Sequence, residues 1–313
     1  MDSIRKSTLC SKIFIFYNSP LPQDVQINYH YICFSLPENT YLTIRRPLYV
    51  NHIFSLMETK ESKNIKQPKN NILIFIPVYN EAEYVEEILE EVRNSAPNID
   101  ILVIDDGSTD NTPQILEKET GLHYLRHSEN EGYGKTLIDG FEFAIARNYQ
   151  YIITMDCDKQ HQPDEIIKFT EAVKDEDWDI VSGSRYLEVS NEKSCKVPED
   201  RKKINNRITG YINSLTGYNL TDSFCGFKLY KVTSLKKLKL TEHGYGMPLE
   251  LWIQAWRHNF KIKEVPVALI YLDRDRDQTS SYRKVFRRYR YYLNIINKAI
   301  KDHENTGTGR TPR

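Results

Sequence analysis

The chain has 313 residues, with 43 basic and 43 acidic side chains and a formal net charge of zero at pH 7. This length allows one sizeable α/β domain with extensions, and the charge balance argues against a nucleic-acid-binding protein. The five cysteines are scattered and never spaced as CxxC, which argues against a disulfide framework or a zinc site. No apolar run reaches the roughly 18–20 residues that span a bilayer. We therefore expect a cytoplasmic protein, soluble or at most peripheral on the cytoplasmic membrane face.

The first 70 residues have no sustained helical or alternating hydrophobic period, and the run ETKESKNIKQPKNN follows directly after Met57. Such a polar run is typical of a flexible lead-in. The upstream part can be a non-native translation extension, a small extra module or a disordered arm. We expect residues 1–70 to be an N-terminal extension, so that a chain beginning at Met57 still folds.

From residue 72 on, short apolar runs alternate with helical patterns, which is typical of βαβ units around a mostly parallel sheet. Helices are expected after residue 85, where apolar residues recur at i, i+3, i+4 and i+7, and after the turn signals at Asp110 and Pro163. After Ser190 the rhythm lapses, and one further helix is expected near 204–215. The expected strands are 72–78, 101–104, 151–155 and 179–182.

The last expected helix runs from Tyr282 to about Lys301 and interleaves arginines with aromatic residues. Such a helix can lie on an anionic membrane surface. It can equally pack its aromatic residues on the protein and turn its cations to water. Both interpretations stay open, and residues 302–313 are expected to be a disordered tail.

The strongest chemical signal is the run DCDKQH at residues 156–161, at the carboxyl end of an expected strand. Ligands of open α/β sheets bind at that edge. Strand alternation would put Asp156 and Asp158 on one side, and a turn would bring the Gln160 amide oxygen beside them. These are hard oxygen ligands for Mg²⁺ or Mn²⁺. An acidic helix cap is the simpler alternative, but it requires neither Gln160 nor His161.

The run DCDKQH, followed by Pro163 and Glu165, resembles the DxDxQH motif of the polyprenyl-phosphate sugar synthases. These form the dolichyl-phosphate mannose synthase branch of the family-2 glycosyltransferases. Four further runs resemble motifs of that family in the same order, and the resemblance covers about residues 71–292. The runs are PVYNE at 77–81, VIDDGSTD at 103–110, NEGYGK at 130–135 and GSRY at 183–186.

The resemblance implies the GT-A fold of nucleotide-diphospho-sugar transferases, a Rossmann-like, mostly parallel sheet flanked by helices, over residues 71–301. Its donor and metal half would be 71–190, its acceptor half 191–281 and its basic aromatic helix 282–301. The implied metal ligands are Asp156, Asp158 and Gln160, and the implied catalytic residues are Asp158, Arg185 and Glu250. The implied donor-binding residues are Pro77, Tyr79, Glu81, Asp105, Asp106, Asp156, Gln160, Arg185, Arg201, Arg274 and Arg276.

Each of these positions has a purely structural alternative. Residues 105–108 can form an Asx turn, and Glu81 can belong to a helix cap. Arg185 can be an ion-pair arginine, although a planar guanidinium at a strand end also suits a diphosphate. Glu250 can be an ordinary helix residue. Cys225 stands where the family usually has serine, which puts any hydroxyl role at that position in doubt.

We expect a metal-dependent inverting glycosyltransferase that uses a GDP- or UDP-sugar. The preferred acceptor is a polyprenyl (dolichyl) phosphate, because a phosphate oxygen is already anionic and needs no positioned base. The alternative is a sugar or lipid hydroxyl of a glycan or glycolipid, with Glu250 as its base. A sugar-phosphate nucleotidyltransferase would carry a glycine-rich loop in place of PVYNE, and intact metal ligands count against an inactive binding protein. Neither a Walker loop nor a GxGxxG turn is present.

Overall fold

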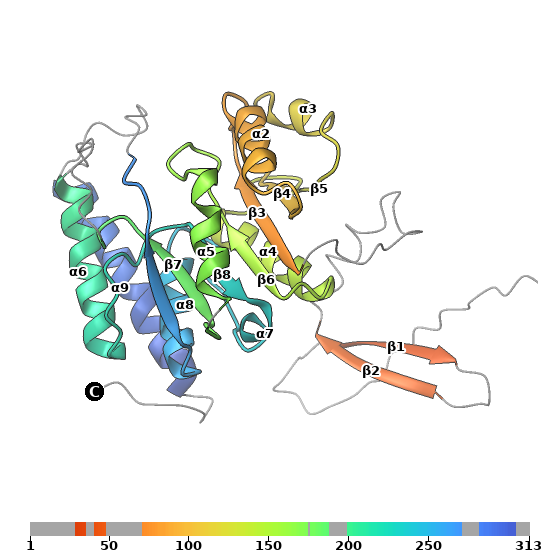
Figure 1. Ribbon diagram of the computed structural model, residues 1–313. Coiled ribbons are helices and arrows are strands. Elements are labelled where there is room, and N and C mark those ends of the chain that lie inside the picture. Colours follow the sequence, from red (N-terminus) through yellow and green to blue (C-terminus); the bar gives the residue numbers. More distant parts are fainter. Residues whose placement is uncertain are drawn as a thin grey trace, which may run out of the picture. The chain divides into compact units, whose positions relative to one another are not determined.

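The computed structural model describes residues 29–35, 41–47, 71–174, 176–187, 199–270 and 282–304 (Figure 1). The chain divides into two compact units, Met1–Ile65 and Lys66–Arg313. In the first unit, β1 (Tyr29–Ser35) and β2 (Tyr41–Pro47) pair antiparallel. These strands lie within the segment that we expect to be an extension. The second unit carries every motif of the resemblance.

The second unit is built on a seven-stranded sheet with the order β5-β4-β3-β6-β8-β7-β9. Only β8 runs antiparallel to its neighbours, β6 and β7. The α/β class and the mostly parallel sheet are thereby confirmed, and the four predicted strands are present as β3, β4, β6 and β7. The strand bounds are β3 Ile72–Val78, β4 Asp100–Asp105, β5 His123–Arg126, β6 Tyr151–Thr154, β7 Ile180–Ser184, β8 Lys228–Lys231 and β9 Ile262–Pro266.

Helices cover both faces of this sheet. The predicted helices are all present. The NEGYGK run at 130–135 leads into a long helix, α4, which begins at Tyr133. Helices α4 and α7 were not predicted, whereas α8 contains Glu250, for which an ordinary helix position was the alternative. The bounds are α2 Val85–Ser95, α3 Thr112–Leu116, α4 Tyr133–Ala146, η1 Pro163–Glu165, α5 Ile166–Ala172, α6 Glu199–Thr216, α7 Val232–Leu235, α8 Met247–Arg257 and α9 Tyr282–Glu304.

The main core lies between the sheet and the helices α2 and α5. The apolar stripe of α2, from Val85 to Val92, packs against Ile74 and Ile76 of β3, while Phe169 of α5 joins the same cluster. Burial of apolar surface at about 25 cal/mol per Å² makes this layer the principal source of stability. The strands therefore present only their ends to a ligand.

Helix α4 covers the opposite face of the sheet at very short range. A Cβ atom at Gly140 would lie 2.3 Å from Cε1 of Phe75, a distance that side chains do not tolerate. Glycine at this position therefore allows α4 to rest directly on β3. This close contact fixes the start of α4 relative to the strand ends.

Helices α6, α8 and α9 pack side by side at the other end of the sheet (Figure 1). Ile295 and Ile296 of α9 are buried there, and Arg257 of α8 donates from Nη2 to the carbonyl oxygen of Ile300. Phe286 and Tyr291, nearer the start of α9, are exposed. The second half of α9 therefore packs on the protein through its aliphatic residues, whereas two aromatic residues of its first half are exposed.

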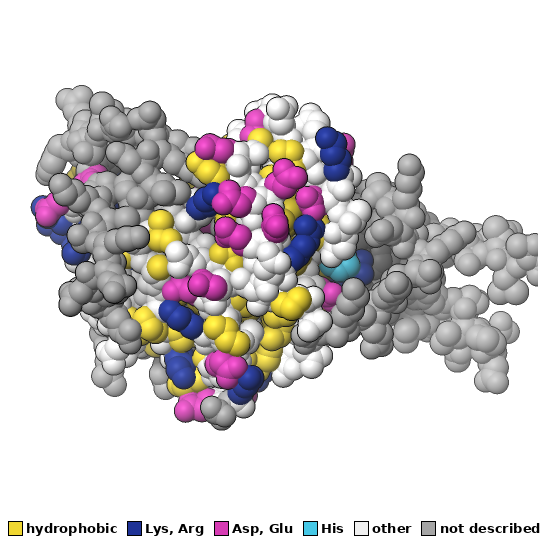
Figure 2. Space-filling view, turned by 45° about the horizontal axis from the view of Figure 1, so that its top comes forward, with side chains coloured by type: hydrophobic (Ala, Val, Ile, Leu, Met, Phe, Trp, Pro, Cys, Tyr) yellow, Lys and Arg dark blue, Asp and Glu magenta, His cyan; other side chains and the backbone are white. Residues whose placement is uncertain are grey.

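Over the described residues, no helix is both long and apolar enough to cross a membrane. Figure 2 shows acidic and basic side chains interspersed over the visible face of the molecule. This mixture agrees with the balanced composition.

Candidate active site

The loops that follow β3 and β4 are hydrogen-bonded to one another at the carboxyl edge of the sheet. Asn80, whose φ is 55°, donates from its backbone N–H to Ser108 Oγ at 2.8 Å, and its Oδ1 accepts from the N–H of Thr109 at 2.8 Å. The N–H of Glu81 donates to Thr112 Oγ1 at 2.9 Å. The PVYNE and DDGSTD runs thus form one joined surface.

Three residues of the PVYNE run were predicted to bind the donor. Pro77 and Glu81 are buried, whereas Tyr79 is 40% exposed. The carbonyl oxygen of Glu81 also accepts from the N–H of Val85 at 3.0 Å, which starts α2. Glu81 thus closes the turn before α2, whose N-cap is Tyr84 and has no side-chain cap. Tyr79 presents an exposed ring at this edge.

Asp105 is fully buried at the end of β4 and bonded within the protein. Its Oδ1 accepts from the N–H of Ser108 at 2.8 Å, which forms the Asx-type turn foreseen as the structural alternative. Its Oδ2 lies 3.1 Å from Nε of Arg126. A buried carboxylate needs such partners, because an unpaired charge is costly to desolvate.

Asp106 holds the start of α4 and a buried histidine. Its Oδ1 accepts from the N–H of Glu131 at 2.8 Å and lies 2.8 Å from Nδ1 of His127, while Oδ2 accepts from the N–H of Gly132 at 3.0 Å. Nε2 of His127 lies 3.0 Å from Oδ2 of Asp139. In this structure the Asp106 carboxylate is thus occupied by the protein itself.

His127 carries a positive charge in this chain of contacts. Burial alone would lower its pKa, but hydrogen bonds to Asp106 and Asp139 raise the pKa to about 9. Nζ of Lys135 donates to both carboxylate oxygens of Asp139, so that negative and positive side chains alternate from Asp106 to Lys135. No motif pointed to His127, because its two partners lie 21 and 12 residues away.

The predicted metal ligands lie in a turn directly after β6. The Asp158 carboxylate closes this turn, since Oδ1 accepts from the N–H of Gln160 at 3.1 Å and Oδ2 from its Nε2 at 2.8 Å. The backbone N–H of Asp156 donates to Nδ1 of His161 at 3.0 Å. Burial lowers the pKa of His161 to about 4, so this imidazole is neutral and supports the turn as an acceptor.

Asp156 is less enclosed than the acids of the donor loops, with 30% of its side chain exposed. Tyr133 donates from its hydroxyl to Oδ1 at 3.0 Å. A Cβ atom at position 226 would lie 2.4 Å from Oδ2, so Gly226 makes room for the carboxylate. Burial raises the pKa of Asp156, while the hydrogen bond from Tyr133 and the charges of Lys228 and Arg185 oppose that rise.

The residues of this turn have the chemistry that a Mg²⁺ or Mn²⁺ ion requires. Asp156, Asp158 and Gln160 carry carboxylate and amide oxygens, the hard donors that these ions prefer. Within the ranges that the structure describes, no group of three His, Cys, Asp or Glu side chains is arranged for a metal ion. A bound ion would therefore take the rest of its ligands from water and substrate phosphates.

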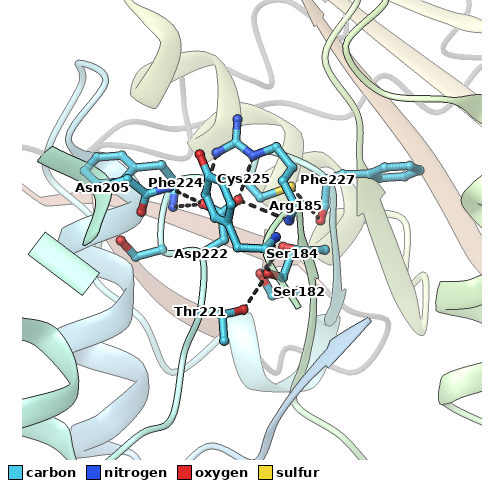
Figure 3. Close-up of polar contacts among 12 residues, drawn as sticks. Ser182, Ser184, Arg185, Asn205, Thr221, Asp222, Phe224, Cys225 and Phe227 are labelled. Carbon is cyan, nitrogen blue, oxygen red and sulfur yellow. Dashed lines mark hydrogen bonds and ion pairs between the residues drawn. The ribbon is translucent and has the colours of Figure 1, made fainter. Parts of the chain in front are cut away.

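Arg185 is held in a bidentate ion pair at the end of β7. Its Nε and Nη2 donate to the two carboxylate oxygens of Asp222 at 2.6 and 3.0 Å, and Nδ2 of Asn205 donates to Oδ1 at 2.9 Å (Figure 3). Asp222 is fully buried; burial would raise its pKa, but Arg185 and Asn205 lower it. Arg185 is thus ion-paired, as in the structural alternative of a surface ion-pair arginine, but with a fully buried partner, while 21% of its own side chain is exposed.

Residues 73–239 match Glycosyl transferase family 2. This chain belongs to that family. The chain is 32% identical over 206 residues to an undecaprenyl-phosphate mannosyltransferase of Micrococcus luteus, covering 64% of this chain and 83% of that protein. It is 31% identical over 222 residues to a UDP-N-acetylglucosamine–dolichyl-phosphate N-acetylglucosaminyltransferase of Methanococcus voltae, covering 64% and 86%.

Solved structures share the fold of this glycosyltransferase. Glucosyl-3-phosphoglycerate synthase of Mycobacterium tuberculosis, in complex with Mn²⁺, UDP and glucosyl-3-phosphoglycerate, superposes with a TM-score of 0.56. Its sequence identity is 15%, and the match covers 73% of this chain and 79% of that one. The expected GT-A fold is confirmed.

Glu250, the predicted catalytic acid, lies on the first turn of α8, where it is buried. Its carboxylate accepts from the N–H of Thr241 at 2.9 Å and of Glu242 at 2.8 Å, from Thr241 Oγ1 at 3.0 Å and from Gln254 Nε2 at 3.2 Å. In this structure Glu250 holds the loop 241–246 and faces no open space.

The predicted arginines of the acceptor half are only partly described. Arg201 is exposed near the start of α6, whereas Arg274 and Arg276 lie outside the described residues. Glu165, from the end of the metal motif, accepts from the N–H of Ala268 at 3.0 Å and so holds the segment that leads toward residue 271.

Proposed function

We propose that this glycosyltransferase transfers a sugar from a nucleoside-diphosphate sugar to a polyprenyl phosphate, with Mg²⁺ or Mn²⁺ at the turn 156–160. The observation that carries the proposal is the turn itself, whose partly exposed Asp156 and Asp158 lie at the carboxyl edge of the sheet. Ligands bind at that edge in open α/β sheets. A solved structure of the same fold contains Mn²⁺ and UDP.

Each part of the turn would serve the departing diphosphate. Asp156, Asp158 and Gln160 would hold the ion, which, when bound, would neutralise the charge that develops on the diphosphate. His161 would keep the turn in shape, because it accepts the N–H of Asp156 while neutral. The N–H groups of Arg185 that Asp222 does not engage would face the phosphates.

The nucleoside would lie on the joined surface formed by residues 79–81 and 105–110. Tyr79 offers an exposed ring on which a base can stack. Asp105 and Asp106 would act mainly through the shape that they impose on these loops, because their oxygens accept hydrogen bonds within the protein. Arg274 and Arg276 would bind donor phosphates, and the donor would be a GDP- or UDP-sugar.

A phosphate acceptor suits the acceptor half better than a hydroxyl acceptor. A hydroxyl needs a general base within hydrogen-bond reach, whereas a phosphate oxygen is already anionic. The carboxylate of Glu250, the predicted base, already accepts hydrogen bonds from backbone N–H groups of the loop 241–246. Arg201, which the resemblance assigned to the donor, is exposed and would instead bind the acceptor phosphate. Three relatives are named for lipid-phosphate substrates or products.

Helix α9 would keep the enzyme at the cytoplasmic membrane face. Phe286 and Tyr291 are exposed near its start, and Arg287 and Arg290 are exposed beside them. Each such cation contributes about 1 kcal/mol near an anionic surface. Binding to vesicles that contain anionic lipid should therefore be reversible and should weaken as salt is added.

The deciding experiment supplies radiolabelled GDP- and UDP-sugars with polyprenyl phosphate, and separately with soluble sugar acceptors. We expect labelled lipid phosphate from one donor, dependent on Mg²⁺ or Mn²⁺, from both the wild type and Glu250→Gln. Transfer only to hydroxyl acceptors, abolished by Glu250→Gln, would refute the lipid-phosphate proposal and identify Glu250 as the base.

A further inference from the structure

Tyr133, the first residue of α4, connects that helix to the metal turn. Its hydroxyl donates to Oδ1 of Asp156 at 3.0 Å, and its ring stacks on the ring of Tyr245, with centroids 5.5 Å apart and planes 16° apart. Tyr133 stands in the NEGYGK run at 130–135 and was not among the predicted site residues. A group that hydrogen-bonds to a metal-binding carboxylate orients that carboxylate and so affects how tightly it binds the metal.

The loop 241–246 is hydrogen-bonded to the same turn of α4 and lies in close contact with it. The carbonyl oxygen of His243 accepts from the N–H groups of Gly134 at 2.8 Å and Lys135 at 3.2 Å. A Cβ atom at Gly134 would lie 2.3 Å from the carbonyl oxygen of Glu242, so only glycine permits this approach. The first turn of α4 is therefore clamped in place.

Two further contacts fix the loop that carries Tyr245. Glu250 holds its beginning through the N–H groups of Thr241 and Glu242. Tyr291 of α9 donates from its hydroxyl to Oε1 of Glu242 at 2.7 Å. A continuous path of contacts thus leads from α9 through the loop 241–246 to Tyr133 and Asp156.

The two oxygens of Asp156 are bounded by different neighbours. Oδ1 receives the hydroxyl of Tyr133, while Oδ2 lies where a side chain at position 226 would begin. A hydrogen bond therefore fixes Oδ1 of the carboxylate, whereas Gly226 leaves room beside Oδ2. Its orientation depends on Tyr133 remaining where the loop 241–246 holds it.

We propose that Tyr133 is a positioning residue, which orients the Asp156 carboxylate for a divalent ion and is itself set by Tyr245 from the acceptor side. This inference rests on the proposed metal role of the turn. It adds a residue of the NEGYGK run to the proposed metal site. It also links the loop 241–246 to the affinity of that site for the metal.

The test is a Mn²⁺ titration in the presence of UDP, and separately of GDP, with unbound Mn²⁺ measured by electron paramagnetic resonance. The variant is Tyr133→Phe, which keeps the ring on Tyr245 and removes only the hydroxyl. The matched control is Tyr149→Phe, which removes a hydroxyl that donates to Oδ2 of Asp100, at the start of β4, at 2.9 Å. We expect roughly 10-fold weaker Mn²⁺ binding for Tyr133→Phe and wild-type binding for Tyr149→Phe.

A second variant approaches the other oxygen. Gly226→Ala would push on Oδ2 of Asp156 and should also weaken Mn²⁺ binding. Wild-type affinity in Tyr133→Phe, or an equal loss in Tyr149→Phe, would overturn the positioning role while the metal site stands. If the wild-type protein bound no Mn²⁺ with either nucleotide, the metal role of the turn would fail and this inference with it.

Discussion

Two sets of acids lie at the same edge of the sheet and differ in how deeply they are buried. Asp105 and Asp106, after β4, are buried, and their hydrogen bonds go to N–H groups, an arginine and a histidine of the protein. Asp156 and Asp158, after β6, are partly exposed, although Tyr133 donates to the first and Gln160 donates its N–H and Nε2 to the second. Both sets therefore have partners within the protein, but only the second can be reached from solvent.

The buried histidine beside each set shows the same contrast. His127 lies between two carboxylates, and these contacts raise its pKa to about 9. His161 is lowered to a pKa of about 4, first by burial, although the charge of Asp158 opposes the shift. The loops after β3 and β4 are thus stabilised by an internal charge, and the turn after β6 is supported by a neutral ring.

The largest effect is expected from Asp158→Ala. Because Asp158 is proposed to bind the ion directly, transferase activity should fall more than about 100-fold, beyond what outer partners of a metal site usually cost. The melting temperature should stay close to that of the wild type, since the lost contacts lie within one turn. Initial rates and a circular dichroism melt measure the two quantities. Full turnover in excess chelator would contradict the metal assignment.

The opposite result is expected from Asp106→Ala. This change leaves the N–H groups of Glu131 and Gly132 without their acceptor and takes one carboxylate from His127. Breaking a buried ion pair costs roughly 3–5 kcal/mol, so the free energy of unfolding in urea should fall by that amount. Asp158→Ala, measured in the same experiment, is the control. Equal losses in both variants would remove the distinction between the two sets of acids.

The two histidines should affect the pH dependence of stability in opposite ways, with His127 acting at alkaline pH and His161 at acid pH. The raised pKa of His127 contributes stability below its unfolded value near 6.5 that is lost as pH rises toward about 9. The lowered pKa of His161 contributes stability above 6.5 that is lost as pH falls toward about 4. Each loss should be roughly 1–3 kcal/mol in urea denaturation. His127→Gln should flatten only the alkaline limb and His161→Gln only the acid limb; unchanged limbs would show that other groups control the pH dependence.

The smallest effect is expected from Glu250→Gln, which tests a third acid. Glu250 is buried and its oxygens accept two backbone N–H groups, so it resembles Asp105 and Asp106 in burial and in hydrogen bonding. An amide would turn its NH₂ group toward one of those donors, and the free energy of unfolding should fall by about 1–2 kcal/mol. Transfer to polyprenyl phosphate should persist. A stable but inactive variant would place Glu250 among the acids that act on the substrate.

The sequence by itself determined the sheet strands around which the site forms and the runs at their ends. The apolar run 72–78 and the stripe from Val85 to Val92 are local periodicities, and each became the expected element. The DCDKQ turn after β6 was readable for the same reason, since its acids and amide are neighbours along the chain. Parallel strands then place such turns on one edge without further information.

Only the tertiary structure decided what each acid contacts. Asp106 meets His127 and Gly132, Arg185 meets Asp222 across 37 residues, and Tyr133 reaches Asp156 across 23. No local pattern encodes these meetings, because a hydrogen bond depends on where the packed chain brings its donor. Periodicity and turn chemistry act between neighbouring residues along the chain. The hydrogen-bond partners of these carboxylates instead come from distant segments, which the packed core brings together.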